Sequence, residues 1–271
     1  MVNKYLEEYK ATTLRQCQLK QLSILEHIDA ICRKHAIPYW LDAGTLLGAV
    51  RHGGFIPWDD DIDIAMKTED LERFLAVAPQ ELPPHLHVQN PAAEPTKEPL
   101  VKVRDLNSFF VEGSDNFATP YEKGVYVDIF PYVVYPNVSA SFIRRITKGI
   151  ARSRAILHKA HYYSFRSCAE LFYFGAKLLC CKAIWSVAKI LFPASQSKRT
   201  GYAPILNGCG NSHLISTVYP LTTTTFEGKT FPAPAAIDTY LTDLFGDYMV
   251  IPPPEKRVIH SVFIMPELLK K

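Results

Sequence analysis

The first hydrophobic pattern along the chain has helical spacing. Between residues 13 and 35, apolar side chains recur at intervals close to three and four, at Leu14, Leu22, Leu25, Ile28 and Cys32. This spacing predicts an amphipathic helix over residues 13–35. Thr13 followed by Gln16 resembles a capping box, which predicts that the helix begins at Thr13.

Five shorter segments have the composition or the alternation of strands. Asp61–Ala65 is the clearest, because polar and apolar residues alternate along it. Leu100–Asp105 and Ser108–Glu112 lie close enough in sequence to predict a hairpin. We expect Pro131 to end the strand that comes directly before it. The remaining strand segments are Ile37–Asp42, Leu100–Asp105, Ser108–Glu112 and Val125–Phe130.

Helices and loops are predicted between these strands. A turn and a short helix start at Ala43–Gly48, and Thr68 has the character of an N-cap for a helix over Glu69–Ala78. Residues 79–99 hold six prolines, which predicts a loop, whereas residues 140–192 are mostly helical in pattern. Strands mixed with helices predict the fold class α/β or α+β.

The composition narrows the class of protein. The 271 residues are 48% apolar and 21% charged, which excludes wholesale disorder. No stretch of 18 uncharged apolar residues occurs, so we expect no membrane-spanning helix, and no apolar signal segment opens the chain. The six cysteines form no C-x-x-C pair and are expected to be reduced intracellular thiols. These features predict a cytoplasmic protein.

The charge is unevenly distributed. The formal net charge is +3, but residues 142–200 hold twelve Lys/Arg and one acid, Glu170, which is +11. The remaining 18 Lys/Arg and 26 acids give −8. A basic segment in an otherwise acidic chain predicts an anionic partner, such as phosphate, lipid headgroups or nucleic acid. Because no RNA-binding motif is visible, we expect no nucleic acid.

These patterns divide the chain into three parts. Residues 1–139 are predicted to form a catalytic core, and residues 140–200 a basic helical insertion. Residues 201–271 have few periodic segments and are predicted to be a loop-rich part that completes the catalytic domain.

The strongest chemical signal is a cluster of acids. Residues 59–63 read Asp-Asp-Asp-Ile-Asp. On a strand, Asp61 and Asp63 would point to the same face and repel each other unless a cation lies between them. Asp128 is a lone acid in an apolar strand, where it needs a cation or a hydrogen-bond donor. Oxygen ligands suit Mg²⁺ or Mn²⁺. The alternative is a solvated acidic loop with Asp128 at an edge.

Small residues and an arginine precede the acids. Gly44 and Thr45 follow a predicted strand, and Arg51 stands shortly before Gly53 and Gly54. Turns of small residues let backbone N–H groups approach phosphate oxygens closely. Any one of these glycines could serve only a turn. The order Gly-Thr, then Gly-Gly, then Asp-x-Asp is what points to a phosphate site.

Residues 44–64 resemble the signature of the LicD family. They read Gly-Thr-Leu-Leu-Gly-Ala-Val-Arg-His-Gly-Gly-Phe-Ile-Pro-Trp-Asp-Asp-Asp-Ile-Asp-Ile. The resemblance extends over residues 14–135 and 240–260, through Lys102-Val-Arg-Asp, Val127-Asp-Ile-Phe-Pro and a late Phe-Gly-Asp-Tyr-Met block that starts at residue 245. Residues 140–235 carry no part of it.

The resemblance implies a fold and an activity. LicD proteins transfer phosphocholine and related phospho-alcohols, are distantly related to fukutin-type transferases, and belong to the nucleotidyltransferase-fold superfamily. The implied fold is a mixed sheet flanked by helices. The implied reaction is Mg²⁺-dependent transfer from CDP-choline, or a similar CDP-alcohol, to a hydroxyl of a cell-surface glycan or its lipid-linked precursor, as in lipopolysaccharide or teichoic acid modification.

The resemblance also implies residue roles. Gly44-Thr45, the pair Asp61 and Asp63, and Asp128 match the three elements of the superfamily pattern, a small-residue turn, Asp-x-Asp and a later acid. The three acids would hold one or two metal ions, or Asp128 would accept the hydroxyl proton. The candidates for phosphate and donor binding are Gly44, Thr45, Arg51, Gly53, Gly54, Lys102 and Arg104.

Two further residues are candidates for the acceptor side. Trp58 would stack on a base or close the site, or else belong to the core. His260 would lie near the acceptor, or at the end of a helix. Two other functions remain open: transfer of NMP from an NTP to a small molecule, and a non-catalytic membrane-associated binding protein.

The basic segment raises a separate question. Between Leu171 and Phe192, the three lysines Lys177, Lys182 and Lys189 fall on roughly 140° of a helical wheel at 100° per residue, which leaves a broad apolar face. The segment is either a helix packed on the core or an interfacial helix. In the second case residues 142–200 would contact an anionic membrane, and the protein would be peripheral on its inner face.

Overall fold

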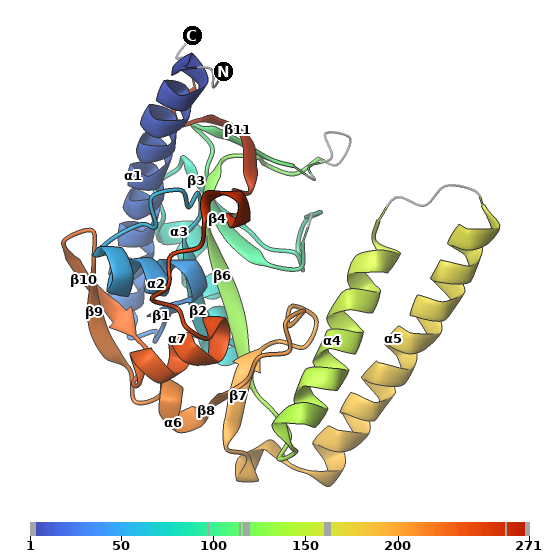
Figure 1. Cartoon of the computed structure of the whole chain (residues 1–271). Helices are drawn as coiled ribbons and strands as arrows, with labels where there is room; N and C mark the ends of the chain where they lie inside the picture. Colours follow the sequence, from blue (N-terminus) through green and yellow to red (C-terminus); the bar gives the residue numbers. More distant parts are fainter. Residues whose placement is uncertain are drawn as a thin grey trace. The chain divides into compact units, whose positions relative to one another are not determined.

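The computed structural model of the chain describes residues 4–96, 98–113, 115, 120–159, 164–257 and 259–268 (Figure 1). It is a mixed α/β fold, so the predicted fold class is confirmed. The chain forms two compact units: unit 1 is Met1–Pro131 with Leu221–Lys271, and unit 2 is Tyr132–Pro220. The predicted boundaries at residues 139/140 and 200/201 stay a prediction.

The main sheet of unit 1 runs in the order β1-β2-β6-β4-β3. Every residue of β4 is buried, which shows that both faces of the sheet are covered there. The strands are β1 (Trp40–Leu41), β2 (Asp63–Lys67), β3 (Leu86–Gln89), β4 (Val101–Asp105) and β6 (Val125–Val134).

Two strand predictions were wrong. β2 begins at Asp63, so Asp61 lies in the loop before the strand, where it is not bound by the alternation of strand faces. The predicted hairpin also does not form. β4 pairs with β3 and β6 instead. β3 lies inside the segment 79–99, which was predicted to be a loop. β5 (Phe109–Glu112) pairs instead with β11 (Ser261–Met265).

Pro131 does not end the strand it was expected to end. β6 pairs with β4 at Val125–Ile129 and with β7 (Arg199–Tyr202) at Tyr132–Val134. Neither of these pairings uses residue 131, so its missing N–H leaves both ladders intact. β6 therefore continues from unit 1 into unit 2, where β7 also pairs with β8 (His213–Leu214).

The helices of unit 1 begin differently from the prediction. α1 (Lys4–Lys34) starts before Thr13, which therefore lies inside the helix and caps nothing. α2 spans Ala43–His52. α3 (Thr68–Glu81) has Lys67 at its N-cap position, so Thr68 is its first residue and not its cap.

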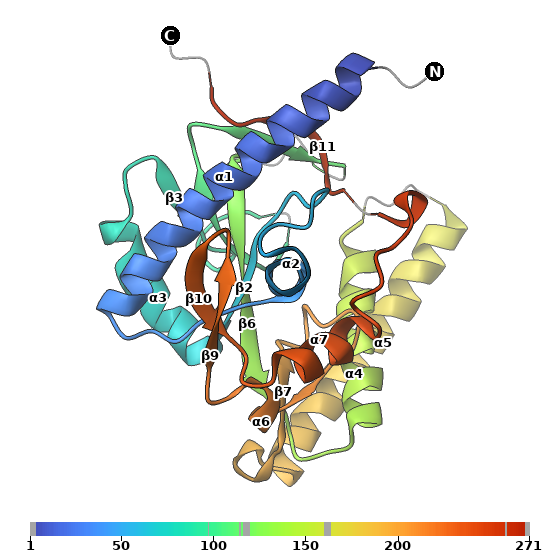
Figure 2. The same cartoon turned by 60° about the vertical axis from the view of Figure 1, so that its left-hand side comes forward.

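The C-terminal part holds more regular structure than the predicted loops. β9 (Thr222–Phe226) and β10 (Lys229–Ala233) form a hairpin that packs against α2 and β1 (Figure 2). Glu227 and Gly228 join them with φ angles of 51° and 73°, as a two-residue turn with both φ angles positive requires. The other elements are α6 (Ile215–Val218), α7 (Ile237–Phe245) and the short 3₁₀ helices Ala194–Gln196 and Pro254–Lys256.

Unit 2 is dominated by two helices, as predicted for residues 140–192, although residues 160–163 lie outside the described part of the chain. α4 (Ala140–Leu157) and α5 (Phe165–Leu191) pack side by side (Figure 1). Gly149 allows the close approach, because a Cβ there would lie 2.6 Å from Cys181 Sγ. Their shared core consists of Tyr135, Ile143, Ile146, Ile150 and Trp185.

α5 differs from an ordinary core helix. In the part of the chain that the structure describes, it is the one helix whose length and composition would allow it to cross a membrane. Only 11% of its most apolar stretch is buried. All six cysteines are free, and two of them, Cys17 and Cys32, are buried.

Candidate active site

Asp42 connects the end of β1 to the start of α2. Its Oδ1 accepts a 2.7 Å hydrogen bond from the Ala43 N–H, which makes Asp42 the N-cap of α2. The same oxygen accepts a 2.6 Å bond from the Tyr240 hydroxyl of α7. This buried carboxylate therefore fixes the N-terminus of α2, where Gly44 and Thr45 lie.

Gly44 and Thr45 each position one acid of the cluster. A Cβ at Gly44 would lie 2.8 Å from Asp59 Oδ2, so the absence of a side chain lets that carboxylate lie over the first turn of α2. The Thr45 hydroxyl accepts a 2.8 Å bond from the Asp63 N–H. The Asp63 carbonyl in turn accepts a 3.0 Å hydrogen bond from the Asp42 N–H, so both backbone polar groups of Asp63 have partners.

Gly53 and Gly54 form the turn that ends α2, and each position disfavours a larger residue for a different reason. Gly53 caps the helix in the left-handed region at φ 72°, and its N–H bonds the Ala49 carbonyl at 3.2 Å. Gly54 contacts the Glu227 carboxylate so closely that a Cβ would collide with it. These glycines shape the turn at the C-terminal end of α2, and their predicted phosphate role stays a prediction.

Asp59, Asp61 and Asp63 form a crowded acidic group. Burial, together with the charges of Asp61 and Asp60, raises the pKa of Asp59 to about 8. Burial also raises the pKa of Asp61, although His260 and Lys102 oppose the rise. Asp59 and Asp61 share a hydrogen bond, which requires a proton on one of the two carboxyls when no metal ion is bound.

Asp63 lies where the predicted trio meets. Burial raises its pKa well above the usual value, and the charges of Asp61 and Asp128 are the next largest causes. Asp42 and Asp59 add to the same effect. The charges of Asp61, Asp128, Asp42 and Asp59 thus act together on Asp63, whereas the metal-binding role of Asp61, Asp63 and Asp128 stays a prediction.

Asp128 is paired with Lys102 across the sheet. The two residues are direct partners on β6 and β4, and Lys102 Nζ lies 2.7 Å from Asp128 Oδ1 and 3.0 Å from Oδ2. Lys102 also lies 3.6 Å from the centroid of the Tyr126 ring. Burial raises the pKa of Asp128 to about 6, and Lys102 limits the rise. The lysine is therefore a buried counter-charge at the edge of the acidic cluster.

The two predicted phosphate-binding arginines have structural partners. Arg104 is buried, and its guanidinium donates to Gln89 Oε1 at 2.9 Å and to the Gly124 carbonyl at 2.9 Å. Arg51 donates from Nη1 to the Tyr248 carbonyl at 2.8 Å, so it holds the C-terminal segment against α2. Asp59 is the charged neighbour that acts on Arg51, which places this arginine beside the cluster.

Asp60 holds the segment that carries His260. Its carboxylate is fully buried and accepts the N–H of His260 at 3.2 Å and that of Ser261 at 2.6 Å. His260 Nε2 then lies 3.8 Å from Asp61 Oδ2. One ligand atom from each of Asp60, Asp61 and His260 falls within 4.8 Å of the others. This trio could hold a metal ion, but both Asp60 oxygens already have amide partners.

The donor set fits a divalent cation of the Mg²⁺ type. Burial is the largest cause that raises the pKa values of Asp59, Asp61, Asp63 and Asp128, and neighbouring carboxylates add to the rise at Asp59, Asp63 and Asp128. A hard cation relieves this repulsion and accepts oxygen ligands only. Among the described residues, the ligand atoms that lie within 4.8 Å of one another are those of Asp60, Asp61 and His260, whereas a metal site of Asp61, Asp63 and Asp128 stays a prediction.

Trp58 lies at the rim of the site. It is half-buried, and the Arg257 guanidinium lies 4.0 Å from the centroid of its ring. His52 makes an edge contact with it, with ring centroids 6.4 Å apart. Arg257 thus covers a face of the ring, which places the tryptophan among the C-terminal residues rather than in the core. Its predicted acceptor role stays a prediction.

The sequence reasoning missed Asp42, Asp59, Asp60, Tyr240 and Arg257 as contributors. Asp42 had a visible signal, because an acid directly before Ala-Gly-Thr is a good N-cap. Asp59 and Asp60 stood in the quoted cluster, but strand alternation drew attention to Asp61 and Asp63. The contact of Tyr240 with Asp42 joins residues 198 positions apart, and nothing in the local pattern indicates it.

Comparison with known proteins gives a family and a set of relatives. Residues 36–166 match the family model described as LicD/FKTN/FKRP, nucleotidyltransferase domain. The chain is 29% identical over 273 residues to the lipopolysaccharide cholinephosphotransferase LicD of Haemophilus influenzae, covering 93% of this chain and 97% of that protein. It is 38% identical over 68 residues to the human ribitol 5-phosphate transferase FKRP, and 36% over 64 residues to the mouse protein. Each FKRP match covers 13% of that protein.

Proposed function

Since this chain belongs to the LicD family, we propose that it moves phosphocholine, or a related phospho-alcohol, from a CDP-activated donor to a hydroxyl of a cell-surface glycan or its lipid-linked precursor. The relative from Haemophilus influenzae, a cholinephosphotransferase that acts on lipopolysaccharide by its name, matches nearly the whole chain and supports this acceptor class. The FKRP matches support a broader set of phospho-alcohols, since those proteins are ribitol 5-phosphate transferases.

The observation that carries the proposal is the crowding of carboxylates beside α2. Burial raises the pKa values of Asp59, Asp63 and Asp128, the charge of Asp61 adds to each rise, and Lys102 is a buried counter-charge. A protein keeps such repulsion where a cation and its phosphate ligands relieve it. Asp61, Asp63 and Asp128 would hold Mg²⁺ or Mn²⁺, which would neutralise charge on the pyrophosphate of the donor.

The residues around the cluster would orient the donor. Lys102, the partner of Asp128, and Arg51, on which the charge of Asp59 acts, would supply positive charge to the phosphates of the donor. The start of α2 offers backbone N–H groups of Gly44 and Thr45 to a phosphate oxygen. Phosphoryl transfer requires chiefly such positioning and charge neutralisation.

The reaction exchanges one P–O bond for another. The acceptor oxygen forms a bond to the phosphorus that bears the alcohol, the bond from that phosphorus to the bridging oxygen breaks, and CMP leaves. The hydroxyl proton passes to a carboxylate of the site. If Asp61 and Asp63 alone hold the metal ion, Asp128 would be the carboxylate that accepts this proton.

The test is product analysis with purified protein and a glycan acceptor. CDP-choline, CDP-ethanolamine and CDP-ribitol are supplied separately, with Mg²⁺ or with EDTA, and CMP and modified glycan are measured. We expect CMP to form from one donor, only with Mg²⁺, and in equal amount to the modified acceptor. Asp61→Asn is the control, because it removes one ligand and changes the volume little.

Two results would overturn the proposal. Release of pyrophosphate from a labelled NTP, with NMP attached to a small molecule, would assign nucleotidyl transfer instead. Failure of every CDP-alcohol, together with unchanged metal binding in Asp61→Asn, would favour a binding protein on a transferase fold.

A further inference from the structure

The side of α5 that faces away from α4 is apolar. Five large side chains lie along it, and their exposed fractions are 90%, 81%, 70%, 53% and 79% at Phe165, Phe172, Leu179, Val187 and Ile190. At about 100° per residue they fall within roughly 80° of one another. The opposite side holds Trp185 and Ala188, both buried. We call the arc centred on the five side chains the outer face of α5.

The outer face has no charge. The other residues within about 60° of its centre are Cys168, Ala169, Ala176, Cys180, Ala183 and Ser186. A helix on the surface of a globular protein usually places its charged residues opposite the core. Here the arrangement is reversed, because large apolar side chains occupy the position farthest from the core. From Phe165 to Ile190 the face is roughly 38 Å long.

The lysines of α5 flank the outer face. Lys177 lies on one side of it, and Lys182 and Lys189 lie on the other, each roughly 100–120° from its centre. Lysines in such positions keep their ammonium groups in the headgroup layer while the apolar face enters the acyl region. Within α5 the one acid is Glu170, which is paired with Arg166.

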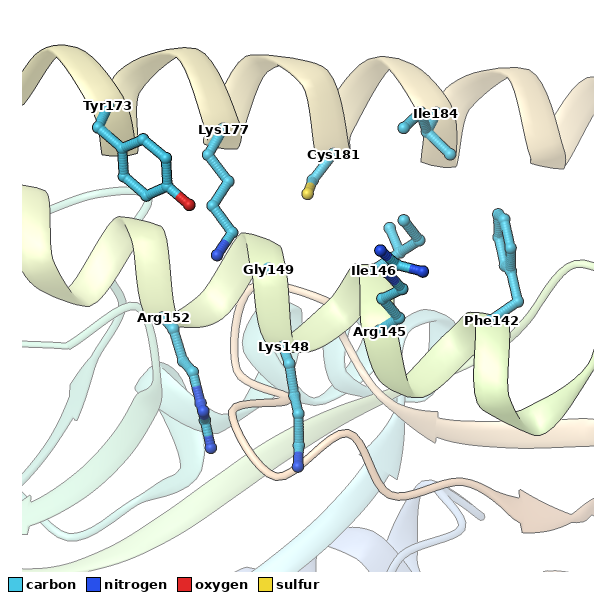
Figure 3. Close-up of a pocket in the computed structure, with 10 residues that line it drawn as sticks. All are labelled: Phe142, Arg145, Ile146, Lys148, Gly149, Arg152, Tyr173, Lys177, Cys181 and Ile184. Carbon is cyan, nitrogen blue, oxygen red and sulfur yellow. The ribbon is translucent and has the colours of Figure 1, made fainter.

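A cationic groove lies between α4 and α5. It has a volume of about 710 Å³ and is lined by Arg145, Lys148, Arg152 and Lys177 with apolar residues between them. Figure 3 shows Lys177 pointing from α5 toward α4, while Lys148 and Arg152 point from α4 away from α5. No acid lines the groove among the described residues. The groove lies on the side of α5 opposite its outer face, so Lys177 is the one residue that it has in common with the lysines that flank that face (Figure 3).

Spanning of the membrane by α5 fits the structure less well than lying on it. α4 packs along α5, and its exposed arginines Arg144, Arg145 and Arg152 would have to enter the hydrocarbon as well. Trp185 of α5 also packs against Tyr135 in the core of unit 2. An insertion perpendicular to the membrane would separate these contacts, whereas docking of the outer face leaves them intact.

We propose that the outer face of α5 docks on the surface of an anionic lipid bilayer. The five large apolar side chains enter the boundary between headgroups and acyl chains, and the flanking lysines Lys177, Lys182 and Lys189 contact lipid phosphates. Three features favour a bilayer over an acidic protein surface as the occupant. The apolar face is long, its one hydroxyl group is that of a serine, and it has cations on both sides.

The test is co-flotation of the full-length protein with vesicles. Phosphatidylcholine vesicles are compared with vesicles that contain one quarter phosphatidylglycerol, at low and high salt. We expect binding to the anionic vesicles only, and weaker binding as salt screens the lysines. The triple change Lys177→Gln, Lys182→Gln and Lys189→Gln should weaken binding on the order of 100-fold.

A second variant tests the apolar part separately. Phe172→Gln, Leu179→Gln and Ile190→Gln together should weaken binding about 10-fold or more at any salt concentration, because only two of the five large apolar side chains remain to contact the acyl chains. The matched controls are Leu19→Gln and Lys34→Gln, an exposed leucine and an exposed lysine of α1, which should leave binding unchanged.

Several results would overturn the proposal. Vesicle binding that is absent, equal on neutral lipid, or retained in both triple variants would exclude docking through this face. If the apolar variant instead abolishes a concentration-dependent dimer measured by light scattering, and vesicles bind nothing, the face is an interface between two copies. Because the readout is lipid binding, failure here leaves the proposed transferase activity untouched.

Discussion

The acidic site of unit 1 and the helix pair of unit 2 depart from the usual distribution of residues in opposite directions. In unit 1, Asp60, Lys102 and Asp128 are charged and almost completely buried. In unit 2, Phe165 and Phe172 are large, apolar and almost completely exposed. Buried charge and exposed apolar surface both raise the free energy of the isolated chain unless something binds there.

The difference teaches what each region requires of its surroundings. The carboxylates around Asp63 have raised pKa values, so they lack positive charge, and a cation with its phosphates would supply it. The outer face of α5 lacks an apolar environment and has surplus positive charge beside it, which an anionic bilayer would supply. The following predictions test whether each region is shaped by its ligand or by folding.

The largest effect is expected at the acidic site. Asp61→Asn and Asp63→Asn should each lower turnover about 100-fold or more, as loss of an electrostatic group in a catalytic site typically does. The metal-free protein should not lose stability, because neutralising one carboxyl relieves repulsion within the cluster. Rates from CMP release and unfolding in EDTA measure the two quantities. Near-normal turnover in both variants would remove the acids from the mechanism.

The second effect concerns shared ligands. Mg²⁺ and CDP together should stabilise the protein more than the sum of their separate effects, because the phosphates of the nucleotide complete the coordination of the metal ion. At a ligand concentration 100 times Kd the stabilisation is about 2.7 kcal/mol. Thermal unfolding with EDTA, Mg²⁺, CDP and both ligands measures it. Strictly additive shifts would place metal and nucleotide in separate sites.

Asp60 should behave differently from its neighbours. Its two oxygens accept hydrogen bonds from the N–H groups of His260 and Ser261. Asparagine at this position would have an NH₂ group in place of one oxygen, and that group cannot accept a hydrogen bond. Asp60→Asn should therefore lower the free energy of unfolding by about 1.5–3 kcal/mol, the range for hydrogen bonds to a charged group. Urea unfolding of this variant beside Asp61→Asn gives the contrast. An Asp60→Asn protein of full stability that loses metal binding would assign Asp60 as a ligand.

The sequence predicted the fold class and the larger elements because these depend on local patterns. The helical spacing after Leu14 and the apolar runs at Val125 and in residues 140–192 each survive in the structure. Pairing partners could not be predicted in the same way. β5 pairs with β11, about 150 residues later, and β3 lies in a proline-rich segment whose strand is held by β4.

The candidate site was predicted in its centre and missed at its edge. Asp61, Asp63 and Asp128 were singled out because acids among apolar residues are locally conspicuous; in the structure the charges of Asp61 and Asp128 act on Asp63, and their catalytic role stays a prediction. Asp42 and Tyr240 were missed because their 2.6 Å bond joins the first strand to α7. The exposure of the apolar face of α5 was equally invisible, since the sequence pattern of a core helix and that of an interfacial helix are the same.

The packing of the two helices in unit 2 gives a smaller effect. A Cβ at Gly149 would lie 2.6 Å from Cys181 Sγ, so Gly149→Ala should lower the free energy of unfolding by about 1–3 kcal/mol. Adding Cys181→Ala should restore part of it by removing the sulfur. Gly175→Ala in α5 is the matched control, since a Cβ there meets nothing within 4 Å. If both glycine variants gain stability, the helices are not held together as the structure has them.

The smallest effect is expected where the side chains are largest. Without lipid, Phe172→Gln should change the free energy of unfolding by less than about 0.5 kcal/mol. The ring is 81% exposed in the folded protein, so folding buries little of its apolar surface. Ile150→Ala, in the buried core of the same unit, should lower it by about 2–5 kcal/mol. Urea unfolding of the two variants beside the unchanged protein measures both effects. A large loss from Phe172→Gln would mean that the outer face is covered by the chain itself, and a negligible one would leave folding unable to explain why the face is apolar.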